Sequence, residues 1–281
     1  MYDTIVIGKG PAGISGAIYA ARAGKNTLVI GKDAGTLGMV KKIENYYGLK
    51  KISGAKLFNA GIEQIKELGC DILDAEVFGI SYNKVYDYSV TTNVGEYRAK
   101  TVLIAVGMVR NKVKIENLEA FEGKGVSYCA VCDGFFYRGK NVIVIGGGEY
   151  ALSEAEHLNR VAKTVSVFTN GAKNVFNTDL PVNTKKIKAI KGMNTVSGVI
   201  TEDSEEIDTD GIFIAAGMAS GIDIAKKIGI IIENNKIITD KNGETNIKGI
   251  YAAGDCMSEL MQIATAVSTG AVAGNSIGKL L

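Results

Sequence analysis

The spacing of apolar and polar positions along this chain predicts strands and helices in alternation. Apolar, β-branched runs at 4–7 and 25–30 predict two strands, and the alanine-rich segment 13–23 between them predicts a helix. A second unit of the same order follows, with strand, helix and strand at 141–145, 149–162 and 164–169. Strands that alternate with helices in this way favour parallel sheets covered by helices.

The other periodic segments predict one more helix, two hairpins, and a final strand and helix. Apolar positions at helical spacing predict a helix over 55–68. Two turn signals, Asn93-Val94-Gly95 and Asn234-Asn235, predict hairpins. The strands expected beside the first turn lie at 85–92 and 96–106, and those beside the second turn lie at 230–232 and 237–238. The last strand is expected at 249–253, and a helix of small residues follows it at 262–280.

Two strand–helix–strand units in 281 residues predict two domains. The fold class that we expect is α/β, with two nested Rossmann-like, three-layer domains. The first domain takes residues 1–112, and the final strand and helix return to complete it with residues 243–281. The second domain takes residues 113–242.

Composition narrows the class of protein. With 46% hydrophobic and 22% charged residues, the chain is typical of a packed globular fold rather than a disordered one. A net charge of +2 argues against a nucleic-acid binder, and the lack of an apolar run of about 20 residues predicts no membrane span. Because Met1-Tyr2-Asp3 leads directly into a strand, we expect no signal peptide and a cytoplasmic protein.

Gly8, Gly10 and Gly13 form a glycine fingerprint between the first strand and its helix. In a dinucleotide-binding turn, the first glycine makes the tight turn and the second lets the backbone approach a pyrophosphate. The third lets the helix pack closely on the strand. The helix N-terminus then offers free N–H groups and a partial positive charge. The acid that would hold a ribose at the end of the second strand is missing, because Gly31-Lys32 stands there.

A second fingerprint, Gly146 to Ala151, keeps the glycine spacing but not the chemistry. Glu149 and Tyr150 bring a negative charge and a large ring to the expected place of a pyrophosphate. The strand that follows ends at Asn170-Gly171, with neither an arginine for the 2′-phosphate of NADPH nor an acid for the ribose of NADH. Two interpretations stay open: this scaffold has lost its nucleotide site, or it reads its ligand in another way.

A CxxC pair, Cys129 and Cys132, lies between the two fingerprints and is followed by Asp133. At this spacing one thiol pKa can be lowered, and the pair can cycle between dithiol and disulfide. A structural disulfide is unexpected in the cytosol, whereas two inert core cysteines remain an alternative to the redox pair. A zinc site needs about four ligands, and we predict no metal. The other candidate ligands are scattered along the sequence as Cys70, His157 and Cys256.

Asp133 is a candidate proton shuttle, because thiol exchange needs a thiolate to be formed and a thiol to be released. Its alternative role is that of a helix N-cap or turn aspartate. We expect Cys70 and Cys256 to be packing residues rather than catalytic ones.

Basic clusters occur at 41–42, 50–51 and 185–188. Such clusters are either solvated surface or contacts for an acidic protein partner, and both interpretations stay open.

Several segments taken together carry a resemblance to a known family. They are Gly8 to Gly13, Ile43 to Gly48 with Ser53-Gly54, Ala105-Val106-Gly107, Ser127 to Phe136, and Gly249 to Asp255 followed by Gln262-Ile263-Ala264. In this order, over nearly the whole chain, they resemble the low-molecular-weight thioredoxin reductase family, of the pyridine nucleotide-disulfide oxidoreductase type. The resemblance implies FAD, a homodimer, thioredoxin as the disulfide substrate and a rotation between two domains. It also implies that Cys132 lies nearer the flavin and Cys129 nearer solvent.

The same resemblance predicts the individual site residues. The catalytic residues expected are Cys129, Cys132 and Asp133. The residues expected to bind FAD are Gly8, Gly10, Pro11, Ala12, Gly13, Gly31, Thr36, Asn45, Val77, Gly107, Gly254, Asp255, Gln262 and Ala264.

The chain departs from the family's pattern mostly on the nicotinamide side. The family's GGGDSA, HRRxxFR and GxxPxT motifs are replaced at Glu149-Tyr150, Thr169-Asn170-Gly171 and 217–221, and Met261 stands in place of an arginine. In this respect the chain resembles the ferredoxin-dependent flavin thioredoxin reductases. We therefore expect reduced ferredoxin rather than NADPH to be the electron donor.

Three other functions stay open on the sequence alone. One is an NAD(P)H-dependent thioredoxin reductase with an atypical pocket. The second is a flavin-dependent dithiol oxidase that passes electrons to oxygen. The third is a redox sensor without enzyme activity, which changes partners when its CxxC pair is oxidised.

Overall fold

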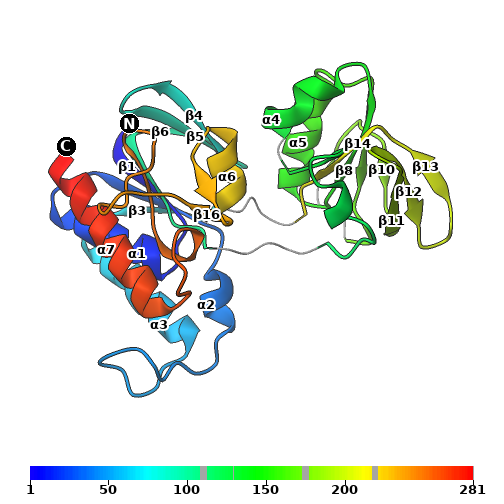
Figure 1. Ribbon diagram of the computed structural model, residues 1–281. Helices are drawn as coiled ribbons and strands as arrows, with labels where there is room; N and C mark the ends of the chain where they lie inside the picture. The colour runs from blue at the N-terminus through cyan, green and yellow to red at the C-terminus, as the bar shows by residue number, and fades with distance from the viewer. Residues whose placement is uncertain (108–112, 129, 173–176, 217–220, 281) are drawn as a thin grey trace. The chain divides into compact units, whose positions relative to one another are not determined.

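The computed structural model describes residues 1–107, 113–128, 130–172, 177–216 and 221–280. The chain forms two compact units, one of Met1–Val109 with Ser220–Leu281 and one of Arg110–Ala219. Both are α/β units, as predicted (Figure 1). Each is described below by itself.

The first unit is built on a seven-stranded sheet with β1 (Tyr2–Ile7) inside it. Parallel neighbours flank β1, with Ile5 opposite Leu28 on one side and Val102 on the other. The last four residues of β1 are buried, which agrees with the continuous apolar run of a strand covered on both faces. The strand order is β3-β2-β1-β6-β5-β4, and β17 pairs with the second half of β6. The other strands are β2 (Thr27–Ile30), β3 (Asp71–Leu73), β4 (Val77–Lys84), β5 (Asp87–Thr92), β6 (Gly95–Ile104) and β17 (Ile250–Ala252).

Helices of small residues pack against each other beside this sheet. Helix α1 (Pro11–Arg22) contacts α7 (Ile263–Leu280) along its length, as Figure 1 shows in blue and red. A Cβ added at Gly270 would lie 2.1 Å from the carbonyl oxygen of Ala12, and one at Gly274 would lie 2.2 Å from that of Gly16. The two backbones therefore approach so closely that only glycine fits at these positions. The unit also contains α2 (Gly35–Met39) and α3 (Gly54–Glu67).

The boundary between the units lies earlier than predicted, because residues 221–242 belong to the first unit rather than the second. Helix α6 (Gly221–Lys227) packs against β4, and the Lys227 Nζ donates a hydrogen bond to the Phe78 carbonyl at 3.0 Å. The hairpin of β15 (Ile232–Glu233) and β16 (Lys236–Ile237) follows. Its Lys236 Nζ donates to the carbonyl of Asp255 at 2.8 Å, which holds this segment to the first unit. The prediction of 243 as the returning point was therefore wrong by about one helix and one hairpin.

The second unit has a parallel sheet in the order β10-β9-β8-β14-β7 and a separate antiparallel sheet β11-β12-β13. The Ile and Phe side chains of both sheets share one buried cluster. The parallel strands are β7 (Val126–Ser127), β8 (Asn141–Ile145), β9 (Thr164–Phe168), β10 (Val182–Asn183) and β14 (Gly211–Ile214). The antiparallel strands are β11 (Ile187–Gly192), β12 (Val196–Thr201) and β13 (Glu206–Asp208), and the helices are α4 (Ala130–Asp133), α5 (Glu149–Asn159) and the 3₁₀ helices η1 (Glu119–Phe121) and η2 (Gly134–Tyr137).

Candidate functional site

The first glycine fingerprint forms the turn that its spacing predicts. Gly8 follows β1 with a φ of +112°, and a Cβ there would lie 2.3 Å from the Ala105 carbonyl oxygen. A Cβ at Gly13 would lie 1.9 Å from the Gly8 carbonyl oxygen, so helix α1 sits directly against the turn. Gly10, in contrast, has open space where its side chain would be. The backbone is therefore accessible at the one glycine where a ligand would approach.

The start of α1 is suited to an anion. Pro11 occupies the first turn, no side chain caps the helix, and the first turn contains no acid. The N–H groups of Ala12 and Gly13 lie in the first turn, where an α-helix offers them no carbonyl partner. Free N–H groups at a helix N-terminus form a ready binding site for a phosphate.

The C-terminal motif Gly254-Asp255 lies against this turn, although about 240 residues separate the two in sequence. A Cβ added at Gly254, whose φ is +81°, would lie 2.9 Å from the Cβ of Ala12. The backbone N–H of Gly254 donates to the Thr269 hydroxyl at 2.9 Å, which fixes the turn. Burial raises the pKa of Asp255 from its ordinary value. A partly buried carboxylate beside a phosphate-binding turn is suited to accept hydrogen bonds from ligand hydroxyls.

Two other predicted cofactor residues are joined to each other. The Asn45 side-chain amide donates to the Oε1 of Gln262 at 2.8 Å, which connects the loop after α2 with the start of α7. Thr36 lies in α2, and Ala264 lies in the first turn of α7. Gly107, with a φ of +70°, follows β6, and Val77 begins β4.

Gly31 is also near the fingerprint, where it lies against Lys9. Lys9 forms an ion pair that the sequence did not predict. A Cβ at Gly31 would lie 3.0 Å from both the backbone nitrogen and the Cγ of Lys9. The Lys9 side chain is 6% exposed, and its ammonium is paired with the Asp74 carboxylate. Asp74 follows β3, 65 residues further on, and no local signal connects the two.

The structure describes only part of the predicted dithiol segment. Cys129 lies outside the described residues, and Cys132 belongs to helix α4. Hydrogen bonds hold the described part of this segment. The Ser127 hydroxyl donates to the Oδ2 of Asp133 at 2.7 Å, and the Ala130 N–H donates to the Oε2 of Glu154 at 2.8 Å. Glu154 is 3% exposed and comes from α5, the helix of the second fingerprint. Sequence reasoning missed Glu154, because nothing in the sequence connects a helix-interior glutamate with a backbone group 24 residues earlier.

The other two cysteines are packing residues. Cys256 is fully buried, and its thiol donates to the carbonyls of Ala253 and Ile104 at 3.3 and 3.6 Å. Burial raises the pKa of Cys256 to about 12 and that of Cys70 to about 11. Neither residue therefore carries a thiolate at neutral pH, so neither is a nucleophile there.

The second fingerprint forms the same turn with different surroundings. A Cβ at Gly146 would lie 2.2 Å from the Ala215 carbonyl oxygen, and Gly148 has open space before α5. Glu149 is in the first turn of α5. The sequence predicts the ring of Tyr150 in front of the turn, at the place of a pyrophosphate. In the structure this ring is 2% exposed and packs inside the unit.

The end of β9 holds a cation that the sequence did not predict there. A Cβ at Gly171 would lie 2.6 Å from the Cε and 2.8 Å from the Cγ of Lys186, so this side chain covers the turn after β9. The neighbouring Asn170 accepts a hydrogen bond from the Ile187 N–H at 2.7 Å, which fixes the turn against β11. The replaced motif at 217–220 lies outside the described residues.

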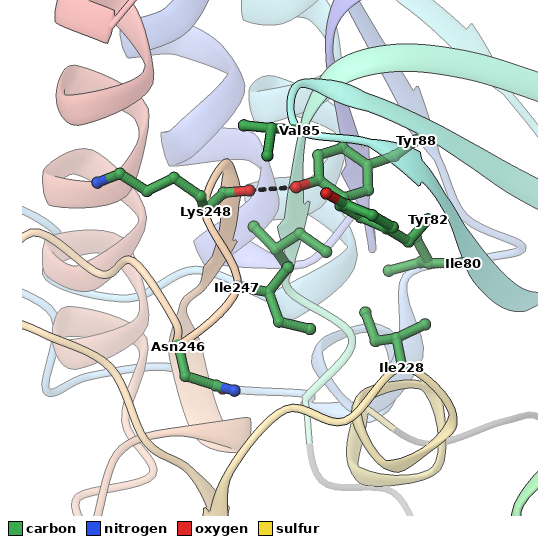
Figure 2. Close-up of a pocket in the computed structure, with 9 residues that line it drawn as sticks. Ile80, Tyr82, Val85, Tyr88, Ile228, Asn246, Ile247 and Lys248 are labelled. Atoms are coloured by element: carbon green, nitrogen blue, oxygen red, sulfur yellow. Dashed lines mark hydrogen bonds between the residues drawn. The ribbon is translucent and has the colours of Figure 1, made fainter.

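A pocket of about 400 Å³ in the first unit contains none of the predicted site residues. Figure 2 shows it between the β4–β5 hairpin and the loop before β17, where the Tyr88 hydroxyl donates to the carbonyl of Lys248. Tyr82 and Tyr88 pack beside each other, with ring centroids 5.8 Å apart. The walls are mainly isoleucine, valine and tyrosine, and they fit a packing defect between hairpin and loop.

Searches of the described residues add two findings. No group of three or more His, Cys, Asp or Glu side chains in them is placed to hold a metal ion. Within the same residues, no helix has both the length and the apolar character that crossing a bilayer requires.

Comparisons with known proteins agree on one family. A model of the pyridine nucleotide-disulphide oxidoreductases matches residues 2–270. A thioredoxin reductase of Bacillus subtilis is 34% identical over 99% of this chain and 94% of its own length. The crystal structure of the atypical thioredoxin reductase from Desulfovibrio vulgaris Hildenborough has 35% identity and a TM-score of 0.94, covering 99% of this chain and 97% of its own. A ferredoxin-flavin thioredoxin reductase from Clostridium acetobutylicum has 32% identity and a TM-score of 0.75, covering 99% and 98%.

Proposed function

This chain belongs to the pyridine nucleotide-disulphide oxidoreductase family and is an FAD-binding flavoprotein of the thioredoxin reductase type, and on that premise we propose that its electrons come from reduced ferredoxin rather than from NADPH. The electrons pass to a disulfide formed by Cys129 and Cys132, and from there to thioredoxin. Two reduced ferredoxins give one electron each. With two protons, these electrons convert the disulfide into two thiols, which then reduce the disulfide of thioredoxin and return to their oxidised state.

The residues of the first unit fit the FAD that the family implies. The open backbone at Gly10 and the uncapped start of α1 would hold the pyrophosphate, and the Asp255 carboxylate would accept hydrogen bonds from hydroxyls of the cofactor. The remaining predicted contacts with FAD are proposed on the resemblance. For Asn45 and Gln262, the hydrogen bond between the two side chains is a further support. When bound, FAD supplies the ability to accept electrons singly and to pass on a pair.

The residues of the second unit support a thiol role. In the proposal, the Asp133 carboxylate takes and returns the proton during exchange with thioredoxin, and the Ser127 hydroxyl fixes its orientation. Glu154 holds the backbone at Ala130 and so fixes the start of α4. The thiols themselves are supplied by Cys129 and Cys132.

An exposed aromatic pair supports a protein as the disulfide substrate. Phe135 and Phe136 follow α4 directly and are 69% and 68% exposed. Two adjacent exposed phenylalanines are costly in water and are typical of a surface that a protein partner covers. In the proposal, thioredoxin docks here, next to the dithiol in the sequence. The proposal also includes a cytoplasmic location and the homodimer that the resemblance implies. Sedimentation equilibrium tests the homodimer.

The single observation that carries the choice of donor is the missing arginine at the end of β9. Strand β9 is followed by Thr169-Asn170-Gly171, where the family's HRRxxFR motif would supply arginines for the 2′-phosphate of NADPH. The similarity to a ferredoxin-flavin thioredoxin reductase supports the same choice.

A second candidate, an NAD(P)H-dependent thioredoxin reductase, is favoured by Lys186. Its side chain lies over Gly171 at the end of β9, and cations at this place can read the 2′-phosphate of NADPH in dinucleotide-binding folds. In this function Lys186 would replace the missing arginines.

The two candidates differ in which donor reduces the flavin. We expect anaerobic FAD-loaded protein to lose its visible flavin absorbance with reduced ferredoxin and to keep it with NADPH. Rapid bleaching with NADPH that is lost in Lys186→Ala would overturn the ferredoxin proposal and support the second candidate. Lys163→Ala, which removes an exposed lysine from the same unit, is the matched control.

A further inference from the structure

Two lysine clusters of the sequence have different electrostatic surroundings. In the 185–188 run, the Lys185 ammonium is 2.7 Å from the Asp203 carboxylate and 2.6 Å from that of Glu205, and these acids raise its pKa. Lys191, in β11 of the antiparallel sheet, pairs with Glu206 at 2.7 Å. The charges of Lys185 and Lys191 are thus balanced by neighbouring acids.

The lysines between α2 and α3 are different. Lys42 pairs with Glu44 at 2.6 Å, but Lys41, Lys50 and Lys51 are exposed and form no ion pair with any described residue. Figure 1 shows this loop as a blue excursion beyond α2 and α3. A bridge between Ile43 and Ile52 closes its base, so the lysines at both ends of the loop are held near each other. Three unbalanced positive charges on a closed loop attract an acidic partner.

Exposed apolar side chains accompany these charges. Met39 is 75% exposed, Tyr47 is 100% exposed, Leu260 is 63% exposed and Met261 is 49% exposed. The hydrogen bond between Asn45 and Gln262 connects the loop with the segment that carries Leu260 and Met261, so both sets belong to one region of the first unit. An apolar centre with a charged rim is the usual composition of a protein interface.

We propose that this region is the docking surface for the electron donor, a small acidic iron–sulfur protein of the ferredoxin class. We call it the donor surface and define it by Met39, Lys41, Tyr47, Lys50, Lys51, Leu260 and Met261. The inference rests on the proposed function, since it assumes a protein donor. It locates that donor at the two residues, Asn45 and Gln262, that are predicted to contact the cofactor. Electron-transfer partners bind through small, transient interfaces, and opposite charges speed their encounter.

The test is the rate of flavin reduction in the FAD-loaded full chain, measured by anaerobic stopped-flow absorbance with reduced ferredoxin. In the charge-reversal variant K41E/K50E/K51E, we expect the second-order rate constant at low salt to fall by about 10- to 100-fold. The fall should shrink as salt is raised, because salt screens exposed charges. K66E/K241E/K279E, which reverses three exposed lysines elsewhere on the same unit, should keep the rate of the unmodified protein.

Two further arms keep the proposal testable. All variants should show the same flavin spectrum and the same reduction rate with dithionite. K41R/K50R/K51R, which keeps the three positive charges, should be reduced by ferredoxin as fast as the unmodified protein. Carbodiimide coupling of ferredoxin to the unmodified protein should then give cross-links at Lys41, Lys50 or Lys51.

The outcomes separate the two proposals. If ferredoxin reduces the unmodified protein and K41E/K50E/K51E equally fast, the donor surface is wrong and the proposed function stands. Cross-links only outside the donor surface would have the same meaning. If ferredoxin fails to reduce the unmodified protein while dithionite succeeds, the ferredoxin donor is wrong, and the donor surface is overturned with it.

Discussion

The two glycine fingerprints have the same backbone turn and opposite chemistry. At the first position, a Cβ would lie 2.3 Å from a carbonyl oxygen at Gly8 and 2.2 Å at Gly146. At the second position, Gly10 and Gly148 both have open space. The start of α1 has no acid in its first turn, whereas the start of α5 has Glu149. The glycine spacing therefore specifies how a strand turns into a helix, while the charge beside the turn differs between the two units.

The third position shows how closely each helix approaches its turn. It is Gly13 in the first unit, where a Cβ would lie 1.9 Å from the Gly8 carbonyl oxygen. In the second unit it is Ala151, whose Cβ is accommodated although the residue is fully buried. Helix α1 is thus held more tightly against its turn than α5.

The largest effect should come from making the first turn like the second. Gly13→Ala forces a Cβ into the Gly8 carbonyl, and we expect a loss of about 1–3 kcal/mol of stability together with release of FAD. The ratio of flavin to protein absorbance and the thermal midpoint measure both. Gly148→Ala, which enters open space in the second unit, is the control and should leave both values unchanged. A Gly13→Ala variant that retains its flavin would show that the close approach is unnecessary.

An effect of intermediate size is expected at the dithiol. Glu154→Gln removes a buried negative charge whose carboxylate accepts the Ala130 N–H, next to Cys129 in the chain. Because a nearby negative charge disfavours a thiolate, its removal should lower the pKa of the adjacent thiol. Alkylation of the reduced protein by iodoacetamide near pH 7 should be several-fold faster.

The matched control for this variant is Glu156→Gln, which changes an exposed residue of the same helix. Cys70 and Cys256 provide an internal reference. Their pKa values, raised to about 11 and about 12 by burial, keep both thiols protonated and slow to react until the pH is far above neutral. Equal alkylation rates in the two glutamine variants would mean that Glu154 has no influence on the thiols.

The smallest effect should come from making the second turn like the first. Glu149→Gln removes the acid at the start of α5, and a charge near a helix terminus is worth about 0.3–1 kcal/mol. We expect the affinity for NADPH, measured by calorimetry, to rise about two- to five-fold. If instead the unmodified protein binds NADPH tightly and this variant binds it no better, the acid is not what weakens the site.

The fold was predictable where local sequence signals agree with tertiary packing. The two strand–glycine–helix units follow from short apolar runs and glycine spacing, and the Asn234-Asn235 hairpin has the positive φ angles, 47° and 61°, that its turn type requires. Strands β4 and β11 were not identified, because each has two register shifts that interrupt the two-residue period. The other two strands of the antiparallel sheet, β12 and β13, were not identified either.

The site was predictable as motifs but not as contacts. The glycines around Gly8 and the acid Asp255 were predicted from their sequence context, and the structure places Gly254 against Ala12. Contacts between residues distant in sequence, such as Glu154 with Ala130 and Lys9 with Asp74, were not predicted. A single sequence contains no signal for such pairs, since each depends on how the elements pack.

The contact between α1 and α7 has a consequence for synthesis. Close backbone contacts at Gly270 and Gly274 join α1 to α7. Every residue of the second unit is synthesised after α1 and before α7. During translation the second unit, a single stretch of chain, can fold before the first unit has its last strand and helix. The turn at Gly8 therefore stays incomplete until α7 has been made. We accordingly expect FAD to be acquired only after the second unit has been synthesised.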